Sequence, residues 1–260
     1  MRIRPGIEMA SLTDVGCQRE NNEDFLSYWE PDSDADFLKK GRLALIADGM
    51  GGYEGGQEAS RLAVETIQNI YDSNAGGDLR DALLQGFRTA HEKIRAYAEA
   101  HPEFEGMGTT CTALALNDLQ LYFAHVGDSR LYLVRGATIS RLTRDHSYVG
   151  RLVESGVLGS EEAERHPQRH ILTAALGAGV EVVADAPADP IDLENGDVLV
   201  LCTDGLWSLI HEPEILEILE TKTTPAAACK EMVKRARQRG GPDNITVQIL
   251  KISANGNFRK

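Results

Sequence analysis

The sequence predicts an α+β fold in which antiparallel β-structure is combined with helices that precede and follow it. Four short strands are read in series in the middle of the chain, at residues 110–116, 121–126, 130–135 and 138–142. Hairpin signals separate them, and short strands joined in this way form an antiparallel sheet, not the parallel sheet of a βαβ array. Two helical patterns precede this segment, and two more lie near the end of the chain.

The N-terminal part of the chain is predicted to supply two strands and an exposed loop. A weak strand signal spans residues 6–11, and a polar, turn-rich stretch then reaches Asp24. Residues 30–40 contain proline and several charges and are predicted to form an exposed hairpin loop. The apolar run 42–47 reads as a buried strand that delivers Asp48 to its end.

Two helices are predicted after the glycine-rich turn that follows this strand. Apolar residues at helical spacing run from Ala59 to Tyr71, and Asp78 is expected to cap a second helix that ends before Pro102. His91 lies on the second helix, where a lone histidine is predicted to be a surface residue and not a metal ligand.

After the central strands, the pattern becomes irregular before regular elements return. Residues 143–178 read as an irregular excursion on the rim of the fold, with short helical pieces at 147–155 and 160–165. The histidines of this segment do not have the spacing of a regular zinc site. The rest of the chain is predicted to contain two strands, two helices and a last strand, at residues 180–184, 198–203, 212–220, 225–239 and 245–252.

Composition and charge limit the possible functions. The chain has 260 residues, a net charge of −13 and an isoelectric point of about 5.0, which argues against nucleic acid or an anionic membrane as the main partner. No secretory signal is visible, and no apolar run approaches the ~20 residues that span a bilayer. The cysteines are far apart, and Cys111 and Cys202 fall in apolar strand patterns, which predicts core positions in a reduced, cytoplasmic protein.

The residues with the clearest chemical meaning are four aspartates at strand ends, close to glycine. Asp48 follows the apolar run 42–47, and the others are Asp128, Asp204 and Asp243. Each one alone is typical of an ordinary turn, because Asp is a common turn residue and Asp-Gly, as at Asp48, is a common turn pair. Strand ends of a packed β-structure can converge on one rim, however. Carboxylates brought together in this way repel one another, and a divalent cation is the usual way to stabilise them.

Seven motifs occur along the chain in order: Arg19-x-x-x-Glu23-Asp24, Asp48-Gly49-Met50-Gly51-Gly52, Gly108-Thr109-Thr110, Val126-Gly127-Asp128-Ser129-Arg130, Leu142-x-x-Asp145-His146-Ser147, Thr203-Asp204-Gly205-Leu206 and Asp243-Asn244. This arrangement resembles the metal-dependent protein phosphatase (PPM) family, the type 2C serine/threonine phosphatases, in its compact bacterial form. The resemblance covers about residues 8–252. One Asp-Gly pair is weak evidence, whereas seven ordered motifs in matching strand context are specific.

The resemblance implies a four-layer α-β-β-α sandwich, in which two central antiparallel sheets pack face to face between helices. It also implies a single phosphatase domain over residues 1–260, with residues 143–178 as the variable flap beside the active site. The helices and short strands read from the sequence agree with this architecture.

The resemblance also implies a set of metal ligands. Asp48 would bridge two Mn²⁺ or Mg²⁺ ions, and Gly49 would bind through its carbonyl oxygen. Asp204 and Asp243 would complete the site of the second ion. Asp128 matches the carboxylate of a third, weaker metal site in bacterial members of the family.

Three further residues complete the implied active site. Glu23 and Asp24 would hold metal-bound waters or orient the ligands, and Arg19 would bind the substrate phosphate. The family often carries a histidine after the metal-binding Asp-Gly, as the acid for the leaving alcohol, but Met50 stands there and no general acid is assigned. His170 stands where many relatives have asparagine, which affects the contacts of the flap.

The implied reaction is hydrolysis of phosphoserine or phosphothreonine on proteins. Two divalent ions ~3.5–4 Å apart lower the pKa of a bridging water and stabilise charge on the phosphoryl oxygens, so no phospho-enzyme is required. Carboxylates are the hard oxygen ligands that Mg²⁺ and Mn²⁺ prefer, and arginine offers two parallel donors to phosphate. The expected partners are phosphorylated substrates of a cognate serine/threonine kinase, and the expected state is a monomer.

Two other functions use the same residues. A non-catalytic phosphoprotein-binding module on this fold is one alternative, because a fold does not fix a function. Such a module should have lost at least one proposed metal ligand, whereas Asp48, Asp204 and Asp243 are all present, together with Arg19. The other alternative is a hydrolase that acts on small phosphate esters, which requires a closed pocket.

Overall fold

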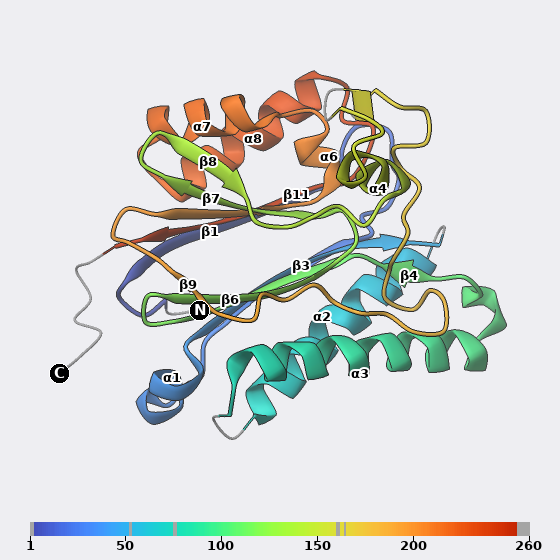
Figure 1. The fold of residues 1–260 in the computed structure, drawn as a ribbon, viewed down its shortest axis with the longest axis horizontal. Helices are drawn as coiled ribbons and strands as arrows, with labels where there is room; N and C mark the ends of the chain where they lie inside the picture. The colour runs from blue at the N-terminus through green and yellow to red at the C-terminus, as the bar shows by residue number, and fades with distance from the viewer. Residues whose placement is uncertain (1–2, 52–53, 75–76, 160–161, 164, 254–260) are drawn as a thin grey trace.

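The computed structural model describes residues 3–51, 54–74, 77–159, 162–163 and 165–253. In this part of the chain, two antiparallel sheets face each other at the centre, and helices cover the outer face of each sheet (Figure 1). On one outer side lie α7 (Glu212–Thr221) and α8 (Pro225–Gln238), and on the other lie α2 (Gly55–Ser73) and α3 (Leu79–Ala100). The predicted four-layer α-β-β-α sandwich is therefore confirmed.

The strand order joins parts of the chain that are distant in sequence. The first sheet contains, in spatial order, β1 (Ile7–Asp14), β11 (Ile245–Ile252), β10 (Val198–Cys202), β7 (Arg130–Arg135) and β8 (Thr138–Arg141). The second sheet contains β2 (Asp24–Trp29), β3 (Arg42–Met50), β5 (Cys111–Asn117), β6 (Gln120–Val126) and β9 (Ile191–Asp192), and β4 (Gly108–Thr109) pairs with β3. Each sheet thus contains strands from both the N-terminal and the C-terminal half of the chain.

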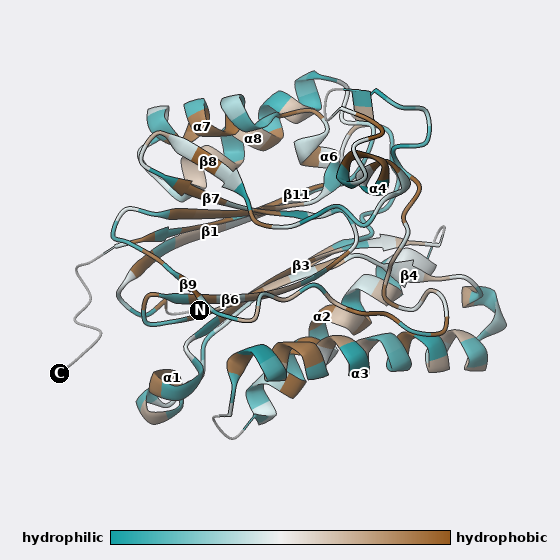
Figure 2. Ribbon diagram, in the orientation of Figure 1, coloured by the Kyte–Doolittle hydropathy of each residue, from teal (hydrophilic) through white to brown (hydrophobic). Residues whose placement is uncertain are grey.

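Strand β3 shows why the sheets stay together. Leu43 and Leu45 pack in the core between this sheet and the helices α2 and α3, whereas Ala44 and Ile46 pack in the core between the two sheets. Side chains alternate across a strand, so a strand covered on both faces is apolar at every position. In Figure 2, hydrophobic residues accordingly follow the strands of both sheets, while the helices alternate hydrophobic and hydrophilic turns.

Most predicted elements are present with small differences at their ends. Asp78 caps α3 as expected, since its side chain accepts hydrogen bonds from the backbone N–H groups of Arg80 and Asp81. Cys111 and Cys202 are fully buried, as predicted for core residues. Among the described helices, none is both long and apolar enough to cross a membrane.

Three local predictions were wrong. Residues 30–40 are not a hairpin loop, because α1 (Asp34–Lys40) begins after Ser33, whose hydroxyl oxygen accepts a hydrogen bond from the Asp36 N–H at 3.0 Å. No regular strand forms at 180–184. His91 is 4% exposed and therefore not a surface residue, since the segment that carries Gly177 covers it and donates a backbone hydrogen bond to its ring.

The flap contains less regular structure than the rest of the chain. Its helix α4 (Tyr148–Glu154) confirms the predicted piece at 147–155 and lies beside the short helix α6 (Asp204–Trp207) in Figure 1. The predicted piece at 160–165 includes residues 160, 161 and 164, which lie outside the described residues, as does Gly52 of the glycine-rich motif. A short 3₁₀ helix, Pro102–Phe104, ends the segment after α3.

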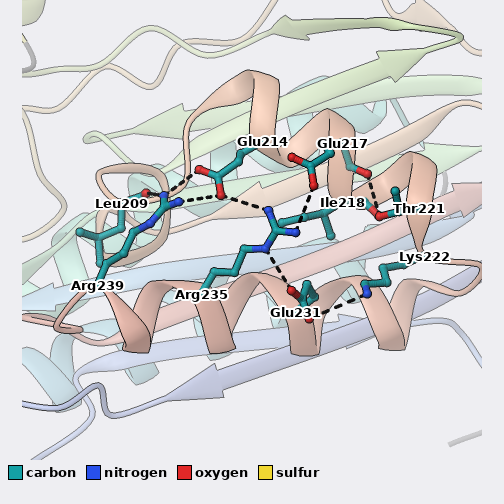
Figure 3. Close-up of polar contacts among 9 residues, drawn as sticks. All are labelled: Leu209, Glu214, Glu217, Ile218, Thr221, Lys222, Glu231, Arg235 and Arg239. Carbon is teal, nitrogen blue, oxygen red and sulfur yellow. Dashed lines mark hydrogen bonds and ion pairs between the residues drawn. The ribbon is translucent and has the colours of Figure 1, made fainter.

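Two arginines of α8 tie this helix to α7 and to the segment before it (Figure 3). Arg235 lies 3.1 Å from a carboxylate oxygen of Glu214 and 3.1 Å from one of Glu217. Arg239 lies 2.7 Å from Glu214 and donates a hydrogen bond to the carbonyl oxygen of Leu209. Leu209 lines the cavity described below, so this network anchors one wall of that cavity.

Candidate active site

The centre of the site is a pair of aspartates on neighbouring strands of the second sheet. Asp24 begins β2, and the antiparallel register places it directly opposite Asp48 on β3. Like charges in this position repel each other. Asp24 is 6% exposed, and burial, with a smaller contribution from neighbouring carboxylates, raises its pKa to about 7. Its Oδ2 accepts a hydrogen bond from the Thr203 hydroxyl at 2.9 Å, but its Oδ1 has no partner among the described residues.

The backbone of Asp48 is fixed by the Gly108-Thr109-Thr110 motif. The Thr110 N–H and the Thr109 hydroxyl each donate a hydrogen bond of 2.8 Å to the Asp48 carbonyl, and the Asp48 N–H donates one of 3.1 Å to the Thr110 hydroxyl. Burial is the largest cause that raises the pKa of the Asp48 carboxyl well above its usual range, and Asp24 and Asp204 are the next causes. The motif therefore holds the backbone of this residue in place, although burial and the neighbouring carboxylates disfavour the charged form of its side chain.

The glycines beside Asp48 allow three pieces of backbone to meet. The Gly49 N–H donates a hydrogen bond of 3.2 Å to the Glu23 carbonyl, and the Ser60 hydroxyl on α2 donates one of 2.6 Å to the same oxygen. A Cβ on Gly49 would lie 2.0 Å from the Gly56 carbonyl oxygen, and one on Gly56 would lie 2.3 Å from Glu23 Oε2. Glycine is required at both positions, because any side chain would separate α2 from the strand end.

The first sheet contributes two aspartates. Asp204 comes after β10, and Asp243 comes before β11. Asp204 is the first residue of α6, and a Cβ on the next residue, Gly205, would lie 1.9 Å from the Asn244 carbonyl oxygen. The Asn244 side chain accepts a hydrogen bond of 2.8 Å from the Glu23 N–H. Asn244 therefore couples the Asp243 turn to the Glu23 turn of the other sheet. Burial is the main cause that raises the pKa of Asp243, followed by Asp204.

Asp128 lies in the tight turn after β6 and is 6% exposed. Gly127 has a φ of +110°, and a Cβ there would lie 2.4 Å from the Thr110 Cβ, so the turn requires glycine. The Asp128 carbonyl accepts a hydrogen bond of 2.9 Å from the Trp207 indole N–H. Burial, and then Asp204, raise the pKa of the Asp128 carboxyl well above its usual range.

Two basic side chains lie against the acidic ones. Arg19 Nη2 is 2.8 Å from Asp243 Oδ2, and the His170 ring nitrogen Nδ1 is 3.8 Å from Asp204 Oδ2. Arg19 is thus near the predicted site, but its guanidinium contacts a carboxylate that was itself predicted as a metal ligand. The burial of Glu23 raises its pKa, and Arg19 opposes this shift.

All of the predicted site residues except Asp24 line one cavity of about 900 Å³ at the end of the sandwich. The sequence-predicted residues on its wall are Arg19, Glu23, Asp48, Gly49, Asp128, Asp204 and Asp243. Asp24 is buried just behind this wall, opposite Asp48. The structure therefore brings together the whole predicted set, from both sheets.

Sequence reasoning missed two residues that position this set, Thr203 and Asn244. Thr203 donates its hydroxyl to Asp24, and the same hydroxyl accepts a hydrogen bond of 3.1 Å from the Thr246 N–H. Both missed residues are direct neighbours of predicted aspartates, so adjacency was the available signal. Their roles nevertheless depend on contacts between distant parts of the chain.

The chemistry of the set fits hard divalent cations. Its donors are carboxylate and carbonyl oxygens, the pKa values of Asp48, Asp128 and Asp243 are raised, and Asp24 Oδ1 is buried without a partner. No group of three or more His, Cys, Asp or Glu side chains within the described residues is drawn together closely enough to hold an ion by itself.

Known proteins match this chain over almost its whole length. The family model described as "Protein phosphatase 2C" matches residues 19–247. A putative protein phosphatase 2C-type of Streptococcus pyogenes is 37% identical over 248 residues, which cover 94% of this chain and 97% of the relative. The protein phosphatase PhpP of Streptococcus pneumoniae is 35% identical over 251 residues, covering 95% of this chain and 98% of the relative.

Solved structures agree with the sequence matches. A serine/threonine phosphatase of S. agalactiae has a TM-score of 0.87 and 35% identity, covering 95% of this chain and 100% of that chain. The catalytic domain of the serine/threonine protein phosphatase PstP, solved in complex with 2 manganese ions, has a TM-score of 0.82 and 33% identity, covering 95% of this chain and 99% of that chain. The chain belongs to the protein phosphatase 2C family.

Proposed function

We propose that this chain is a protein serine/threonine phosphatase that hydrolyses phosphoserine and phosphothreonine with bound Mn²⁺ or Mg²⁺ and without a phospho-enzyme. The observation that carries this proposal is the single cavity in which carboxylates from both sheets meet an arginine. The 2 manganese ions in the related PstP structure support a metal-dependent reaction.

The proposed ligands of the two tightly bound ions are Asp48, the carbonyl of Gly49, Asp204 and Asp243. Asp128 is the proposed ligand of a third, weaker ion, and Glu23 and Asp24 would orient waters and ligands around the ions. When bound, two such ions supply an activated water and stabilise charge on the phosphoryl oxygens. Occupation of the site also removes the repulsion that raises the pKa of Asp48 and Asp243.

Arg19 is the proposed contact of the substrate phosphate. Its side chain is 49% exposed and held 2.8 Å from Asp243. The planar donors of its guanidinium match two phosphate oxygens. Met50 lines the same cavity, and its thioether cannot donate a proton to a leaving alcohol. We therefore assign no protein general acid.

Removal of the metal is the direct test of this function. Exhaustive EDTA treatment should abolish hydrolysis of a phosphothreonine peptide, and added Mn²⁺ or Mg²⁺ should restore it, because the proposed donors are all oxygen atoms. Phosphate release is measured before and after the additions, with a panel of small phosphate esters alongside the peptide. Turnover that survives EDTA would exclude the proposed mechanism, and activity on small esters alone would favour the small-ester hydrolase.

Replacement of Arg19 separates phosphate binding from metal binding. Arg19→Ala should raise the KM for a phosphothreonine peptide by about tenfold, because it removes a charge-assisted contact, and should leave Mn²⁺ affinity nearly unchanged. Steady-state kinetics and calorimetric Mn²⁺ titration measure the two effects, with Arg19→Lys as the control that keeps the charge. If the KM stays constant while Mn²⁺ binding weakens, Arg19 is a structural partner of Asp243 instead.

We further propose that the phosphatase domain spans residues 1–260, acts as a monomer and opposes a cognate serine/threonine kinase in the cytoplasm. The names of the related serine/threonine phosphatases support a phosphoprotein substrate. The four cysteines are free, which fits a reduced compartment. Light scattering of the purified protein would test the monomer.

A further inference from the structure

The proposed active-site cavity has a basic wall as well as an acidic one. Arg165, Arg169 and His170 of the flap line the same cavity as the carboxylates. The net charge of the chain is −13, so a group of arginines in one cavity contrasts with the acidic character of the chain as a whole. Arginine offers five N–H donors in a rigid fork, which suits it to bind carboxylates and phosphates.

Three other arginines in and beside the flap have acidic partners. Arg144 lies 2.7 Å from Asp185, and Arg130 lies 2.7 Å from Asp145. Arg141 contacts Asp145 as well, at 3.2 Å. These ion pairs hold the base of the flap on the sandwich. The guanidinium groups in them are already occupied by Asp145 and Asp185, so they are not available to an external anion.

Arg165 and Arg169 differ from these paired arginines. Within the part of the chain that the structure describes, neither guanidinium forms an ion pair with an acidic side chain. Arg169 is partly buried and also lines a smaller neighbouring cavity, beside Trp207. Unpaired donors on the wall of a cavity are free to bind an anion that enters it.

The cavity is larger than a single phosphoryl group requires. Its volume of about 900 Å³ lies in the range that accommodates drug-sized ligands, at ~300–1,000 Å³. The carboxylates and Arg19 occupy the part of the wall that comes from the sandwich, whereas Arg165 and Arg169 come from the flap. A peptide could therefore place one phosphate at the carboxylates and a second anionic side chain at the flap.

We propose that Arg165 and Arg169 form a second anion-binding subsite, which recognises a further phosphorylated residue close in sequence to the one that is hydrolysed. This inference rests on the proposed function, because the first phosphate must occupy the acidic part of the cavity. The subsite makes multiply phosphorylated segments preferred substrates. The subsite strengthens substrate binding and not the chemical step, so we expect a lower KM for doubly phosphorylated peptides and an unchanged kcat. The difference in KM should become smaller at high salt, because salt screens the charges.

The test compares peptides with one and with two phosphothreonines, spaced one to four residues apart. Each wild-type and variant protein is measured for kcat and KM on every peptide, at low and at high salt. The affinity of non-hydrolysable phosphonate versions of the same peptides is measured by fluorescence anisotropy, which does not depend on turnover. The variants are Arg165→Gln, Arg169→Gln and the double substitution. Arg151→Gln is the matched control, because Arg151 is an exposed flap arginine that lines a neighbouring cavity and not this one.

The wild-type protein is expected to bind the best doubly modified peptide about tenfold more tightly than the singly modified one, which is the usual size of one charge-assisted contact. The ratio of the two affinities should fall to near one in the double variant, and the control should keep the wild-type ratio. The same loss should appear in the ratio of KM values and not in the ratio of kcat values.

Three results would overturn the proposal. The first is a wild-type protein with no preference for the doubly modified phosphonate. The second is an unchanged preference in the double variant. The third is an equal loss of affinity for both peptides, which would assign these arginines to the scissile phosphate. Failure of the proposed function looks different, because neither phosphorylated peptide would then be hydrolysed by the wild-type protein, whatever the phosphonate affinities.

Discussion

Replacement of Asp48 by asparagine is expected to abolish turnover of a phosphothreonine peptide, with a loss of at least about a thousandfold, because the proposed ions lose the carboxylate that they share. The fold should remain, since the Asp48 backbone is held by Thr109 and Thr110 and not by its side chain. The metal-free variant should even melt at a higher temperature than the metal-free wild type. The neutral amide faces Asp24 without the repulsion that raises the pKa of the Asp48 carboxyl.

The experiment combines initial rates with thermal melting, each in EDTA and in Mn²⁺. Asp81→Asn is the control, because Asp81 is an exposed aspartate on α3 whose side chain is 75% accessible. It should keep wild-type turnover. Near-wild-type turnover in the Asp48 variant would show that this carboxylate is dispensable, and a lower melting temperature in EDTA would show that it stabilises the metal-free protein.

Ionisation of Asp24 is expected to lower the stability of the metal-free protein as the pH rises from about 4 to 7. Asp24 has a pKa of about 7 in the folded protein and ~3.9 in an unfolded chain, so the folded state holds its proton more tightly. Its contribution to the free energy of unfolding is complete below the unfolded pKa and is lost as the pH rises through about 7. The raised pKa values of Asp48 and Asp128 act in the same direction.

Buried His125 has the opposite effect at lower pH. Burial lowers its pKa to about 4, whereas an unfolded histidine titrates at ~6.5, so stability is lost as the pH falls between these values. Between about pH 4 and 6.5 this gain from His125 opposes the loss from Asp24. Mn²⁺ should stabilise the protein more at pH 8 than at pH 6, because ions bind the deprotonated carboxylates.

Urea denaturation in EDTA and in Mn²⁺, at a series of pH values, measures both effects. Asp24→Asn is the informative variant, since it should gain stability relative to the wild type as the pH rises from about 4 to 7 and show no further gain above 7. If the difference in stability between the two proteins does not change over this range, the Asp24 carboxyl ionises in the folded protein as readily as in an unfolded chain.

The acidic site could be predicted from the sequence because the same pattern, an aspartate at a strand end near glycine, occurs four times. Asp48, Asp128, Asp204 and Asp243 each stand at a strand end near glycine, and strand ends are positions that a fold can bring together. The contact between Arg19 and Asp243 could not be predicted in the same way, because it joins residues 224 positions apart. The residues were therefore found, while the local arrangement of their charges was not.

The errors in the fold have separate physical causes. At 180–184 the valines gave a strand-like pattern, and Val182 and Ala184 do pack against the core, but Val180 and Val183 are 78% and 81% exposed and the segment has no strand partner among the described residues. The helix at 34–40 had a readable signal, since Ser33 caps it and lysines occupy its last turn, and the charges were misread as a loop. His91 is covered by a segment 86 residues away, which no local pattern reveals.

The position of β11 has a consequence for the time at which the protein becomes active during its synthesis. Ile7 pairs with Ile252, and β11 separates β1 from β10, so the first sheet cannot be completed until residues 245–252 have left the ribosome. Asp243 and Asn244 directly precede that strand. The second sheet and its two long helices, in contrast, use mainly earlier residues. A growing chain can thus pack the second sheet against α2 and α3 before two of the residues that complete the proposed active site take their places, so the strand order delays the proposed activity to the end of synthesis.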